Sequence, residues 1–472
     1  MRVLYVAAEA YPFIKTGGLA DVAGSLPLAL NSKGIDTRVV MPLYSKIDSQ
    51  YKEDMKYLGY FYVDMDWRHQ YAGVYEIVHN GTTFYFIDNE FYFNRNSLYG
   101  EADDGERFIY FSKAVTLLPK FLDFKPDIIH SNDWHSAMVN VFAKDFARGD
   151  EYYRDIKLLF TIHNLKYQGL FPPVILQLAG LSPEYFSDDA LKFYDVINFM
   201  KGGIVFSDAF NTVSGSYALE IKNSYFGEAL DGVIRRYEYK LSGIVNGIDY
   251  DIWNPETDKF INHHYSIANL EGKLENKREL QRMYGLPERD DVPIISIISR
   301  LVEMKGVDLV AYILDELLQS DIQFIVLGTG DRQYEDMLKY FEWKYPDKLA
   351  ARIYYNNEES HKIYAGSDFL LMPSLSEPCG VAQLIAMRYG TIPIVREAGG
   401  LKDTVTPYSE FNKDGTGFSF ANINAHDMLY TIRRAISYYY NEEFKDIISN
   451  AMNAKNDWEE SSKTYIDLYK RI

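Results

Sequence analysis

The stretch RVLYVAAEAYPFIKTGGLADVAGSLPLAL, residues 2–30, contains one complete strand–loop–helix unit. It is apolar from Val3 to Ala8, which predicts a buried strand. A loop with Lys15 and two glycines follows, and a pattern of helical spacing then runs to Leu30. A buried strand that leads through a glycine-rich loop into a helix is typical of α/β proteins with a parallel sheet.

The same alternation of strands and helices repeats along the chain in two series. The predicted strands are Val3–Ala8, Arg38–Met41, Phe84–Ile87, Asp127–His130, Leu158–His163 and Ala209–Val213 in the first, and Ile294–Ser299, Phe324–Leu327, Arg352–Tyr355, Phe369–Met372 and Ile392–Val395 in the second. Two such series predict two Rossmann-like, doubly wound parallel-sheet domains with ligands in a cleft. We expect residues 1–244 to form the first domain, with a C-terminal helix over 458–472 crossing back to it, and residues 245–457 to form the second.

The bulk composition limits the number of domains and the partners. A chain of 472 residues exceeds the usual size of one core, so two or three domains are expected. Lys and Arg number 49 against 67 Asp and Glu, a formal net charge of -18, which disfavours nucleic acid as a partner. Attraction of an anionic substrate must therefore come from a few local cations and helix N-termini.

The sequence predicts a cytoplasmic protein without disulfides. Its single cysteine, Cys379, cannot form an intramolecular disulfide, which suits a reducing compartment. The N-terminus lacks the apolar core of a signal peptide, and no apolar run reaches the length of a membrane span, so no membrane partner is expected. An aromatic share of 15% with 40 tyrosines fits either a sugar-stacking surface or ordinary core packing.

Two loops place cations after predicted strands. In the first, Gly17 and Gly18 let backbone N–H groups approach a phosphate at a helix N-terminus, and Lys15 adds a full charge. In the second, Arg300 and Lys305 can neutralise a departing diphosphate at the carboxyl end of a strand. The alternative for both loops is a turn with surface cations. Neither the dinucleotide fingerprint nor the P-loop pattern is present.

The segment Glu377-Pro378-Cys379-Gly380 lies between the predicted strand Phe369–Met372 and a helix that is expected to begin near Val381. Such a loop can hold a carboxylate beside a helix N-terminus, with backbone amides and Cys379 exposed to a ligand. The carboxylate of Glu377 can accept sugar hydroxyls or stabilise an oxocarbenium-like transition state. The alternative is a glutamate that only favours the start of a helix.

Two further strand ends carry polar groups that suit a hexose. His163 and Asn164 end one predicted strand and can offer a backbone carbonyl and side chains to a sugar. Asp133 ends another, followed by Trp134 and His135, and here a buried tryptophan corner is an equally good interpretation. A single histidine among nine is more often structural than functional.

No metal site is predicted. Asp64-Met65-Asp66 and Asp249-Tyr250-Asp251 match the D-x-D pattern of metal-dependent sugar-nucleotide transferases, but a chain with 67 acidic residues is expected to contain such matches by chance. Neither segment ends a clear core strand, and no Cys/His cluster has zinc-ligand spacing. We therefore expect chemistry that needs no metal and no other cofactor.

A series of motifs, in order along the whole chain, resembles the bacterial glycogen synthase and plant starch synthase family. The motifs are KTGGLADV (15–22), HSNDWH (130–135), TIHNLKYQG (161–169), VNGID (245–249), SRLVEMKG (299–306), EPCG (377–380) and GTIPIVREAGGLKDTV (390–405). Each motif is weak alone, but their joint occurrence in register is highly specific. The resemblance implies a GT-B fold and transfer of glucose from ADP-glucose to an α-1,4-glucan such as glycogen or a maltooligosaccharide.

The resemblance also implies roles for individual residues. Lys15, Gly18, Arg300 and Lys305 are assigned to the donor phosphates. His163 and Asn164 are assigned to the donor glucose, with Glu377 and the backbone amides of Cys379 and Gly380 on its other side. Asp21 and Asn246 are assigned to the lining of the cleft, Tyr99 to a loop that reaches the glucose site, and Tyr355 to stacking on adenine. In one place the chain departs from the family, because Gly100 replaces a histidine that many relatives carry. The contacts of this loop with donor or acceptor are therefore not carried over from the family.

The predicted mechanism is front-face transfer with retention of the α configuration. Lys15, Arg300 and Lys305 stabilise the departing phosphate. The carbonyl of His163 and the carboxylate of Glu377 stabilise the positive charge on the sugar. Double displacement would need a nucleophile on the opposite ring face, and none is evident. The alternatives are a glucan synthase that uses UDP-glucose and a catalytically silent glucan-binding protein; no oligomeric state is predicted.

Overall fold

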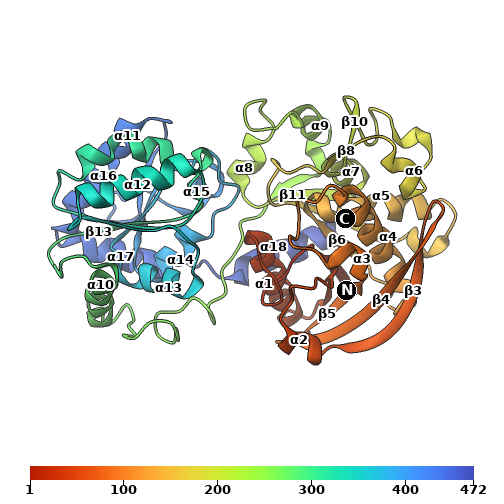
Figure 1. The fold of residues 1–472 in the computed structure, drawn as a ribbon, viewed down its shortest axis with the longest axis horizontal. Helices are drawn as coiled ribbons and strands as arrows, with labels where there is room; N and C mark the ends of the chain where they lie inside the picture. Colours follow the sequence, from red (N-terminus) through yellow and green to blue (C-terminus); the bar gives the residue numbers. More distant parts are fainter. The chain divides into compact units, whose positions relative to one another are not determined.

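A computed structural model describes all 472 residues of the chain (Figure 1). The chain forms two compact units. Met1–Asn246 and Trp458–Ile472 make up the first domain, and Gly247–Asp457 make up the second. The boundary lies after Asn246, whereas the sequence places it after residue 244. Each domain has its own sheet, and the two are described separately below.

The first domain is built on a nine-stranded sheet with the order β12-β11-β7-β6-β1-β2-β5-β4-β3. Its strands are β1 Arg2–Val6, β2 Asp36–Pro42, β3 Lys56–Met65, β4 Arg68–His79, β5 Thr82–Asp88, β6 Ile128–Asn132, β7 Lys157–Ile162, β11 Ala209–Thr212 and β12 Leu241–Gly243; β8 Leu170–Phe171, β9 Lys192–Phe193 and β10 Val196–Asn198 form a small separate sheet. Its helices are α1 Gly18–Ser32, α2 Ser49–Glu53, α3 Glu90–Phe93, α4 Asp104–Phe121, α5 Asp133–Phe146, α6 Ile175–Ala179, α7 Phe199–Phe206, α8 Gly215–Glu220, α9 Asp231–Arg236 and α18 Trp458–Arg471.

The centre of this sheet is parallel and fully buried, as predicted. Strand β1 pairs in parallel with β2 on one side and β6 on the other, and every residue from Val3 to Val6 is inaccessible to solvent. Continuous apolar strands of this kind need helices on both faces. The carboxyl ends of β1, β6 and β7 therefore meet at one edge of the sheet, where the loops with Lys15, Asp133 and His163 begin.

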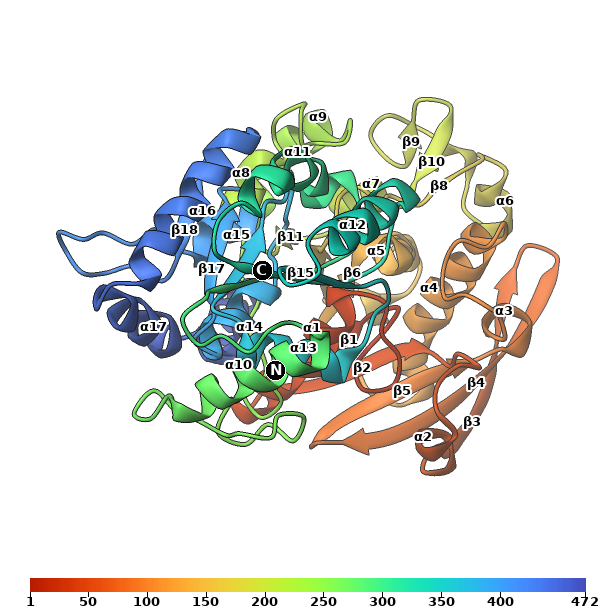
Figure 2. The same ribbon diagram turned by 60° about the vertical axis from the view of Figure 1, so that its left-hand side comes forward.

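One margin of the first sheet differs from the prediction. Strands β3 and β4 form a long antiparallel hairpin that also pairs antiparallel to β5, so the sheet is mixed and not wholly parallel. Figures 1 and 2 show these two long strands at the outer margin of the sheet. The hairpin was not predicted because its tyrosine-rich segments do not form the continuous apolar runs of a central strand.

The C-terminal helix α18 belongs to the first domain. Tyr465, Leu468 and Tyr469 are buried, as their helical spacing predicts. The hydroxyl of Tyr469 lies 2.7 Å from Nδ1 of His130 in β6, and Asn211 in β11 donates a hydrogen bond of 3.1 Å to Tyr465. These buried polar contacts fix the helix against two strands of the sheet.

The second domain is a six-stranded parallel sheet with the order β15-β14-β13-β16-β17-β18. Its strands are β13 Ile294–Ile298, β14 Gln323–Leu327, β15 Leu349–Arg352, β16 Phe369–Met372, β17 Ile392–Arg396 and β18 Phe418–Phe420. Its helices are α10 Glu271–Tyr284, α11 Val307–Leu317, α12 Arg332–Lys344, α13 Asn357–Gly366, α14 Ala382–Arg388, α15 Gly399–Thr404, α16 Ala425–Tyr439 and α17 Glu443–Asn453. The doubly wound order confirms the predicted class for this domain.

The predicted strand Arg352–Tyr355 is wrong in position. Strand β15 covers Leu349–Arg352 and pairs in parallel with β14, which buries Leu349 and the two alanines after it. The chain leaves the sheet at Arg352, and Tyr354 and Tyr355 are exposed. Two tyrosines of high strand propensity favoured the wrong segment, whereas burial of the small residues before them decided the register.

No helix of the chain is both long and apolar enough to cross a membrane.

Candidate active site

The loop with Lys15 and the two glycines is held by a buried carboxylate. Glu9 follows β1 and is almost fully buried. Its Oε2 accepts hydrogen bonds from the backbone N–H of Thr16, at 2.6 Å, and from the Thr16 hydroxyl, at 2.7 Å. The backbone N–H of Gly17 also donates to this carboxylate. Helix α1 begins at Gly18, so Glu9 determines where the loop ends and the helix starts.

Burial raises the pKa of Glu9 to about 7, although the hydrogen bonds from Thr16 oppose this rise. The charged carboxylate therefore stays costly in its site even with its amide donors. A side chain built at Gly18 would meet no atom of this chain within 4 Å. The space next to that residue is thus open to a ligand, which fits the role predicted for Gly18.

Lys15 and Asp21 lie together on this loop and the first turn of α1. Their side chains form an ion pair of 2.7 Å, and both are about one third exposed. Burial raises the pKa of Asp21, and the nearby Lys15 lowers it. The structure therefore joins two predicted site residues, with the lysine charge partly balanced by a carboxylate.

Asp133, His163 and Asn164 are also brought together. Asp133 is the first residue of α5, with a left-handed backbone (φ 54°) that aspartate tolerates better than most residues. Its Oδ1 accepts the backbone N–H of His163 at 2.7 Å and that of Asn164 at 3.4 Å. Burial raises the pKa of Asp133 to about 7. One carboxylate thus holds the turn after β7 on which both predicted sugar-binding residues lie.

His163 is held as a neutral side chain. Its Nε2 lies 2.9 Å from Oδ1 of Asn132, and burial lowers the pKa of the imidazole to about 3. A neutral imidazole at the end of β7 adds no positive charge beside a developing oxocarbenium ion. The two residues after Asp133 form the buried corner that was the alternative interpretation, since Trp134 packs edge-on against Phe108 and both Trp134 and His135 are buried.

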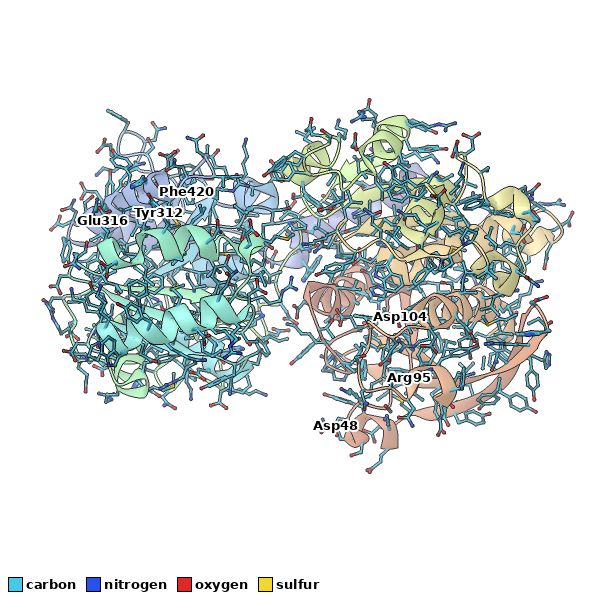
Figure 3. All side chains as sticks on the ribbon, turned by 45° about the horizontal axis from the view of Figure 1, so that its top comes forward. Asp48, Arg95, Asp104, Tyr312, Glu316 and Phe420 are labelled. Atoms are coloured by element: carbon cyan, nitrogen blue, oxygen red, sulfur yellow. The ribbon has the colours of Figure 1, made fainter.

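The loop with Tyr99 is braced by a buried arginine. Arg107 is completely buried, and it donates to the backbone carbonyls of Tyr92 at 2.8 Å and Leu98 at 3.2 Å. It also pairs with Asp104 at 2.5 Å, whose other carboxylate oxygen accepts the N–H of Gly100 at 2.7 Å. Asp104 is marked in Figure 3. The loop conformation therefore depends on Arg107.

Tyr99 and Gly100 differ in what they contribute to that loop. The ring of Tyr99 packs 4.2 Å from the ring of His135, and its hydroxyl is buried. Gly100 has a left-handed backbone (φ 92°), which a histidine adopts only with strain. A histidine at position 100 would therefore strain this loop conformation.

In the second domain, Lys305 and Glu377 form the central contact. Lys305 lies in the 3₁₀ turn Glu303–Lys305 after β13, and its ammonium is 2.5 Å from Oε2 of Glu377. Ser374 donates a second hydrogen bond to the same oxygen at 3.1 Å. Glu377 is 8% exposed. The two residues come from the ends of adjacent strands, β13 and β16, and together provide one positive and one negative group at the same edge of the sheet.

The loop that carries Glu377 is held from behind by an arginine of β17. Arg396 is buried, and it donates to the backbone carbonyls of Ser374 at 2.8 Å and Leu375 at 2.7 Å. Gly399 has a left-handed backbone (φ 44°), and a side chain there would lie 2.1 Å from the carbonyl oxygen of Glu377. Only glycine allows this close approach, so Arg396 and Gly399 of the motif GTIPIVREAGG both support the loop that carries Glu377.

One expectation about this loop is wrong. Cys379 is 4% exposed, so its side chain is buried and not exposed as expected. The role predicted for the backbone amides of Cys379 and Gly380 stays a prediction. Gly380 has a left-handed backbone (φ 73°), and its carbonyl, like that of Cys379, accepts a hydrogen bond from Gln383. The small buried thiol packs where the sequence alone suggests an exposed group.

Arg300, Tyr355 and Asn246 are not joined to the other predicted residues by any hydrogen bond. Arg300 is exposed at the end of β13. Tyr355 is 66% exposed beyond β15, and its hydroxyl contacts Asn357 at 3.4 Å. Asn246 is buried, and its Oδ1 has no hydrogen-bond partner in the chain. Their predicted roles remain predictions.

The D-x-D segments show no arrangement for a cation. Asp64 lies in β3 with its carboxylate 2.5 Å from Nδ1 of His69, and Asp249 accepts the backbone N–H of Asp251. No group of three or more His, Cys, Asp and Glu side chains is placed to hold a metal ion. Metal-independent chemistry stays a prediction.

Three supporting residues, Glu9, Arg107 and Arg396, were not identified from the sequence. Glu9 had a detectable signal, because a carboxylate directly after a buried strand lies at the edge of the sheet where ligands bind. Arg396 had no detectable signal in the sequence, because it ends an apolar strand and its partners are backbone carbonyls of another loop. Arg107 likewise looks like an ordinary charge within a helical pattern.

Two protein families match this chain. The starch synthase catalytic domain family matches residues 2–236, and the family of group 1 glycosyl transferases matches residues 281–454. Each match falls within one of the two domains.

Curated relatives match over the whole chain. A glycogen synthase of Finegoldia magna is 64% identical, with 100% of both chains covered. A glycogen synthase of Clostridium acetobutylicum is 52% identical over the same full coverage. Among solved structures, the catalytic domain of starch synthase IV from Arabidopsis thaliana, bound to ADP and acarbose, has a TM-score of 0.93 at 33% identity. That likeness covers 99% of this chain and 98% of the other.

Proposed function

This chain belongs to the glycogen synthase and starch synthase family with the GT-B fold, and we propose that it transfers glucose from ADP-glucose to the non-reducing 4-hydroxyl of an α-1,4-glucan. Full-length similarity to glycogen synthases establishes a hexosyltransferase. The starch synthase IV structure holds ADP, which supports the adenine nucleotide as the donor here.

The observation that carries the proposal is the pair of Lys305 and Glu377. Transfer requires a nucleoside diphosphate to leave an anomeric carbon, so negative charge grows on phosphate while positive charge grows on the sugar. An ammonium and a carboxylate 2.5 Å apart, at the ends of adjacent strands, offer each charge a partner of opposite sign. Fixed charges of this kind stabilise a transition state without reorganisation.

The first domain contributes the remaining groups. Lys15 and the amino end of α1 add positive potential for the donor phosphates. The turn after β7, held by Asp133, offers the carbonyl of His163 to the anomeric centre and the amide of Asn164 to sugar hydroxyls. Because burial keeps His163 neutral, its ring does not oppose the positive charge of the sugar.

The proposed mechanism is front-face transfer that retains the α configuration and uses no metal. The departing phosphate takes the proton of the incoming 4-hydroxyl, so no protein nucleophile is required. A double displacement needs a carboxylate on the opposite face of the ring. Trapping of a covalent glucosyl-enzyme would overturn front-face transfer and leave the family assignment intact.

The decisive experiment measures incorporation of labelled glucose into glycogen with ADP-glucose or UDP-glucose, each with and without EDTA. Preference for ADP-glucose, unchanged by EDTA, is expected. Preference for UDP-glucose would retain the transferase and change the donor, and loss of activity with EDTA would overturn metal independence. Binding of glycogen without transfer from either donor would favour a catalytically silent glucan-binding protein.

A further inference from the structure

All four backbone carbonyls of the segment Glu377–Gly380, here called the EPCG loop, accept hydrogen bonds from groups of the second domain. The first two accept the backbone N–H of Gly400, at 3.1 Å and 3.2 Å, and the last two accept Nε2 of Gln383, each at 3.0 Å. In an extended chain, successive carbonyls alternate in direction. The common direction of these four is therefore imposed by their two donors, Gly400 on α15 and Gln383 on α14.

The other ends of the same peptide groups point away from these donors. In a planar trans peptide, the N–H of the next residue is directed opposite to the carbonyl. The N–H groups of Gly380 and Val381 therefore turn away from Gln383, and neither donates a hydrogen bond within the chain. Both residues are partly exposed. Gly380 has a left-handed backbone (φ 73°), and successive N–H groups around such a residue form a concave surface that attracts oxygen atoms.

Gln383 is fully buried in the first turn of α14, and its amide has only one possible orientation. Backbone carbonyls only accept hydrogen bonds, so the side-chain nitrogen must face them. Its third contact is the hydroxyl of Thr404 at 3.1 Å. The oxygen Oε1 is buried and has no partner in the chain. A buried acceptor without a donor costs free energy, so this side chain is not the one that stability alone would favour.

The EPCG loop lies directly on the Gln383 amide and on the first turn of α15. A side chain built at Gly380 would lie 2.5 Å from Oε1 of Gln383, and one built at Gly400 would lie 2.1 Å from the carbonyl oxygen of Cys379. Only glycine allows such close contacts. The two helices, α14 and α15, are labelled in Figure 1. The direction of the peptide groups in the loop is thus determined by the Gln383 nitrogen on one side and by α15 on the other.

We propose that Gln383 is a positioning residue that directs the backbone N–H groups of Gly380 and Val381 toward the hydroxyls of the donor glucose. This inference rests on the proposed function, in which the EPCG loop lies beside that glucose. Glu377 belongs to the same loop, so its carboxylate and the N–H groups act on one sugar. N–H groups that are already oriented stabilise a transition state without reorganisation. Because Gln383 is fully buried, it acts through the loop alone.

The test compares Gln383→Met with the matched control Gln281→Met. Methionine fills a similar volume and removes the donor. Gln281 of α10 is equally buried, and its Nε2 donates to the carbonyl of Arg289 at 2.9 Å and to Gln323 at 2.8 Å, at the amino end of β14 and hence at the opposite edge of the sheet. Circular dichroism and thermal melting report the fold. Steady-state kinetics with ADP-glucose and glycogen report turnover, and inhibition by ADP reports binding of the nucleotide.

Both variants are expected to melt at a lower temperature, and only Gln383→Met should lower kcat, by about tenfold. Its inhibition constant for ADP should stay that of the wild type, because the sugar loses its contacts and the phosphates do not. A wild-type kcat in folded Gln383→Met, or an equal loss of kcat in Gln281→Met, would overturn the proposal. ADP binding that weakens as much as kcat falls would also overturn it, since the N–H groups would then serve the phosphates.

Two further variants separate the hydrogens donated to the loop from a general role in packing. In Gln383→Glu a carboxylate faces two carbonyls, and only its protonated form can donate to them. The kcat relative to the wild type should therefore rise as the pH is lowered from mildly alkaline to mildly acidic, and a constant ratio would contradict the proposal. Thr404→Val keeps both bonds to the loop and should keep kcat. A loss equal to that of Gln383→Met would mean that Gln383 only joins α14 to α15, which overturns its positioning role.

Crystal structures of the wild type and of Gln383→Met report the direction of the peptide groups themselves. In the variant, the carbonyl of Cys379 or that of Gly380 is expected to turn outward, and two unchanged carbonyls would overturn the proposal. If the wild type transfers no glucose from either donor, the proposed function fails. The crystal structures, together with the affinity for ADP-glucose measured by calorimetry, then still test the role of Gln383.

Discussion

In the two domains, the loops that carry the predicted site residues are held by buried side chains of opposite charge, here called the two braces. In the first domain the buried carboxylate of Glu9 accepts backbone N–H groups of the loop after β1. In the second, the buried guanidinium of Arg396 donates to backbone carbonyls of the loop after β16. Both loops start at the carboxyl end of a buried parallel strand. The same task is thus solved once with an anion and once with a cation.

The two braces differ in how their charge responds to pH. An arginine remains protonated at every pH that a protein tolerates, so the second loop keeps its brace. The pKa of Glu9 is raised to about 7, so the charge of the first brace changes near neutrality. The groups held by the two braces also differ. The second loop carries an ion pair, and the first carries a lysine that is partly balanced by Asp21.

The largest effect on turnover is expected in the second domain. Lys305→Ala and Arg300→Ala should each lower kcat/KM roughly a hundredfold, because loss of one charged transition-state contact costs about 3 kcal/mol. Steady-state kinetics with glycogen and ADP-glucose measure this, with Lys339→Ala on the exposed face of α12 as the matched control. Turnover like the wild type in both variants would remove the phosphate assignment.

Removal of the Arg396 guanidinium should have the next largest effect on turnover. Arg396→Met fills a similar volume but leaves the carbonyls of Ser374 and Leu375 without their donor, at about 1–3 kcal/mol for each unsatisfied group. We expect a lower melting temperature and about tenfold lower kcat, since Glu377 is displaced from Lys305. Thermal melting and kinetics test both, and a variant with unchanged kcat would show that the loop is held by its glycine contacts alone.

A smaller effect is expected in the first domain. Lys15→Ala should raise the KM for the donor about threefold to tenfold, less than Lys305→Ala, because Lys15 is partly exposed and paired with Asp21. Lys15→Arg keeps the charge and serves as the matched control. An effect as large as that of Lys305→Ala would mean that the first domain contributes equally to the leaving phosphate.

Of these variants, Glu9→Gln should change turnover least. It should change the pH dependence of the free energy of unfolding more than any of the others. The pKa of Glu9 rises from 4.5 to about 7 on folding, so the folded chain binds more protons within this window and the wild type loses stability as pH increases through it. Without this titration, the free energy of unfolding should change by about 3 kcal/mol less across the window. Glutamine keeps an acceptor for Thr16.

Thermal melting of wild type and Glu9→Gln between pH 4.5 and about 7 measures the difference. The melting temperature of the wild type should fall more steeply with pH than that of the variant. Asp133 titrates in both proteins, but the Glu9 carboxylate is one of the charges that raise its pKa, so Glu9→Gln lowers the pKa of Asp133 as well and reduces the pH dependence of the variant further. Parallel curves would show that folding does not raise the pKa of Glu9.

Much of the fold, and the position of several candidate site residues at the ends of strands, were predictable from residue patterns. The strands β13 and β16 fall within one residue of their predicted ends because continuous apolar runs between turns are specific to buried parallel strands. Lys305 and Glu377 were predicted separately, each from its place after such a strand. The same rule placed His163 and Asp133 at one edge of the first sheet.

The misses have a common physical origin. The hairpin β3–β4, the position of β15 and the burial of Cys379 all depend on which neighbour covers a segment, and local composition does not contain that information. Tyr354 and Tyr355 have high strand propensity, yet the small buried residues before them occupy the sheet. The tyrosines of the hairpin β3–β4, by contrast, do lie in strands, at the margin of the first sheet.

The sequence by itself determined the fold class, the two domains, the family and the identity of the groups at the strand ends, because these follow from periodicity, loop chemistry and motif order. Only the tertiary structure decided the contact of Lys305 with Glu377, the carboxylate under the glycine loop and the arginine behind the Glu377 loop. Each of these joins residues from different elements. Their charge states also depend on burial, which exists only once the chain has folded.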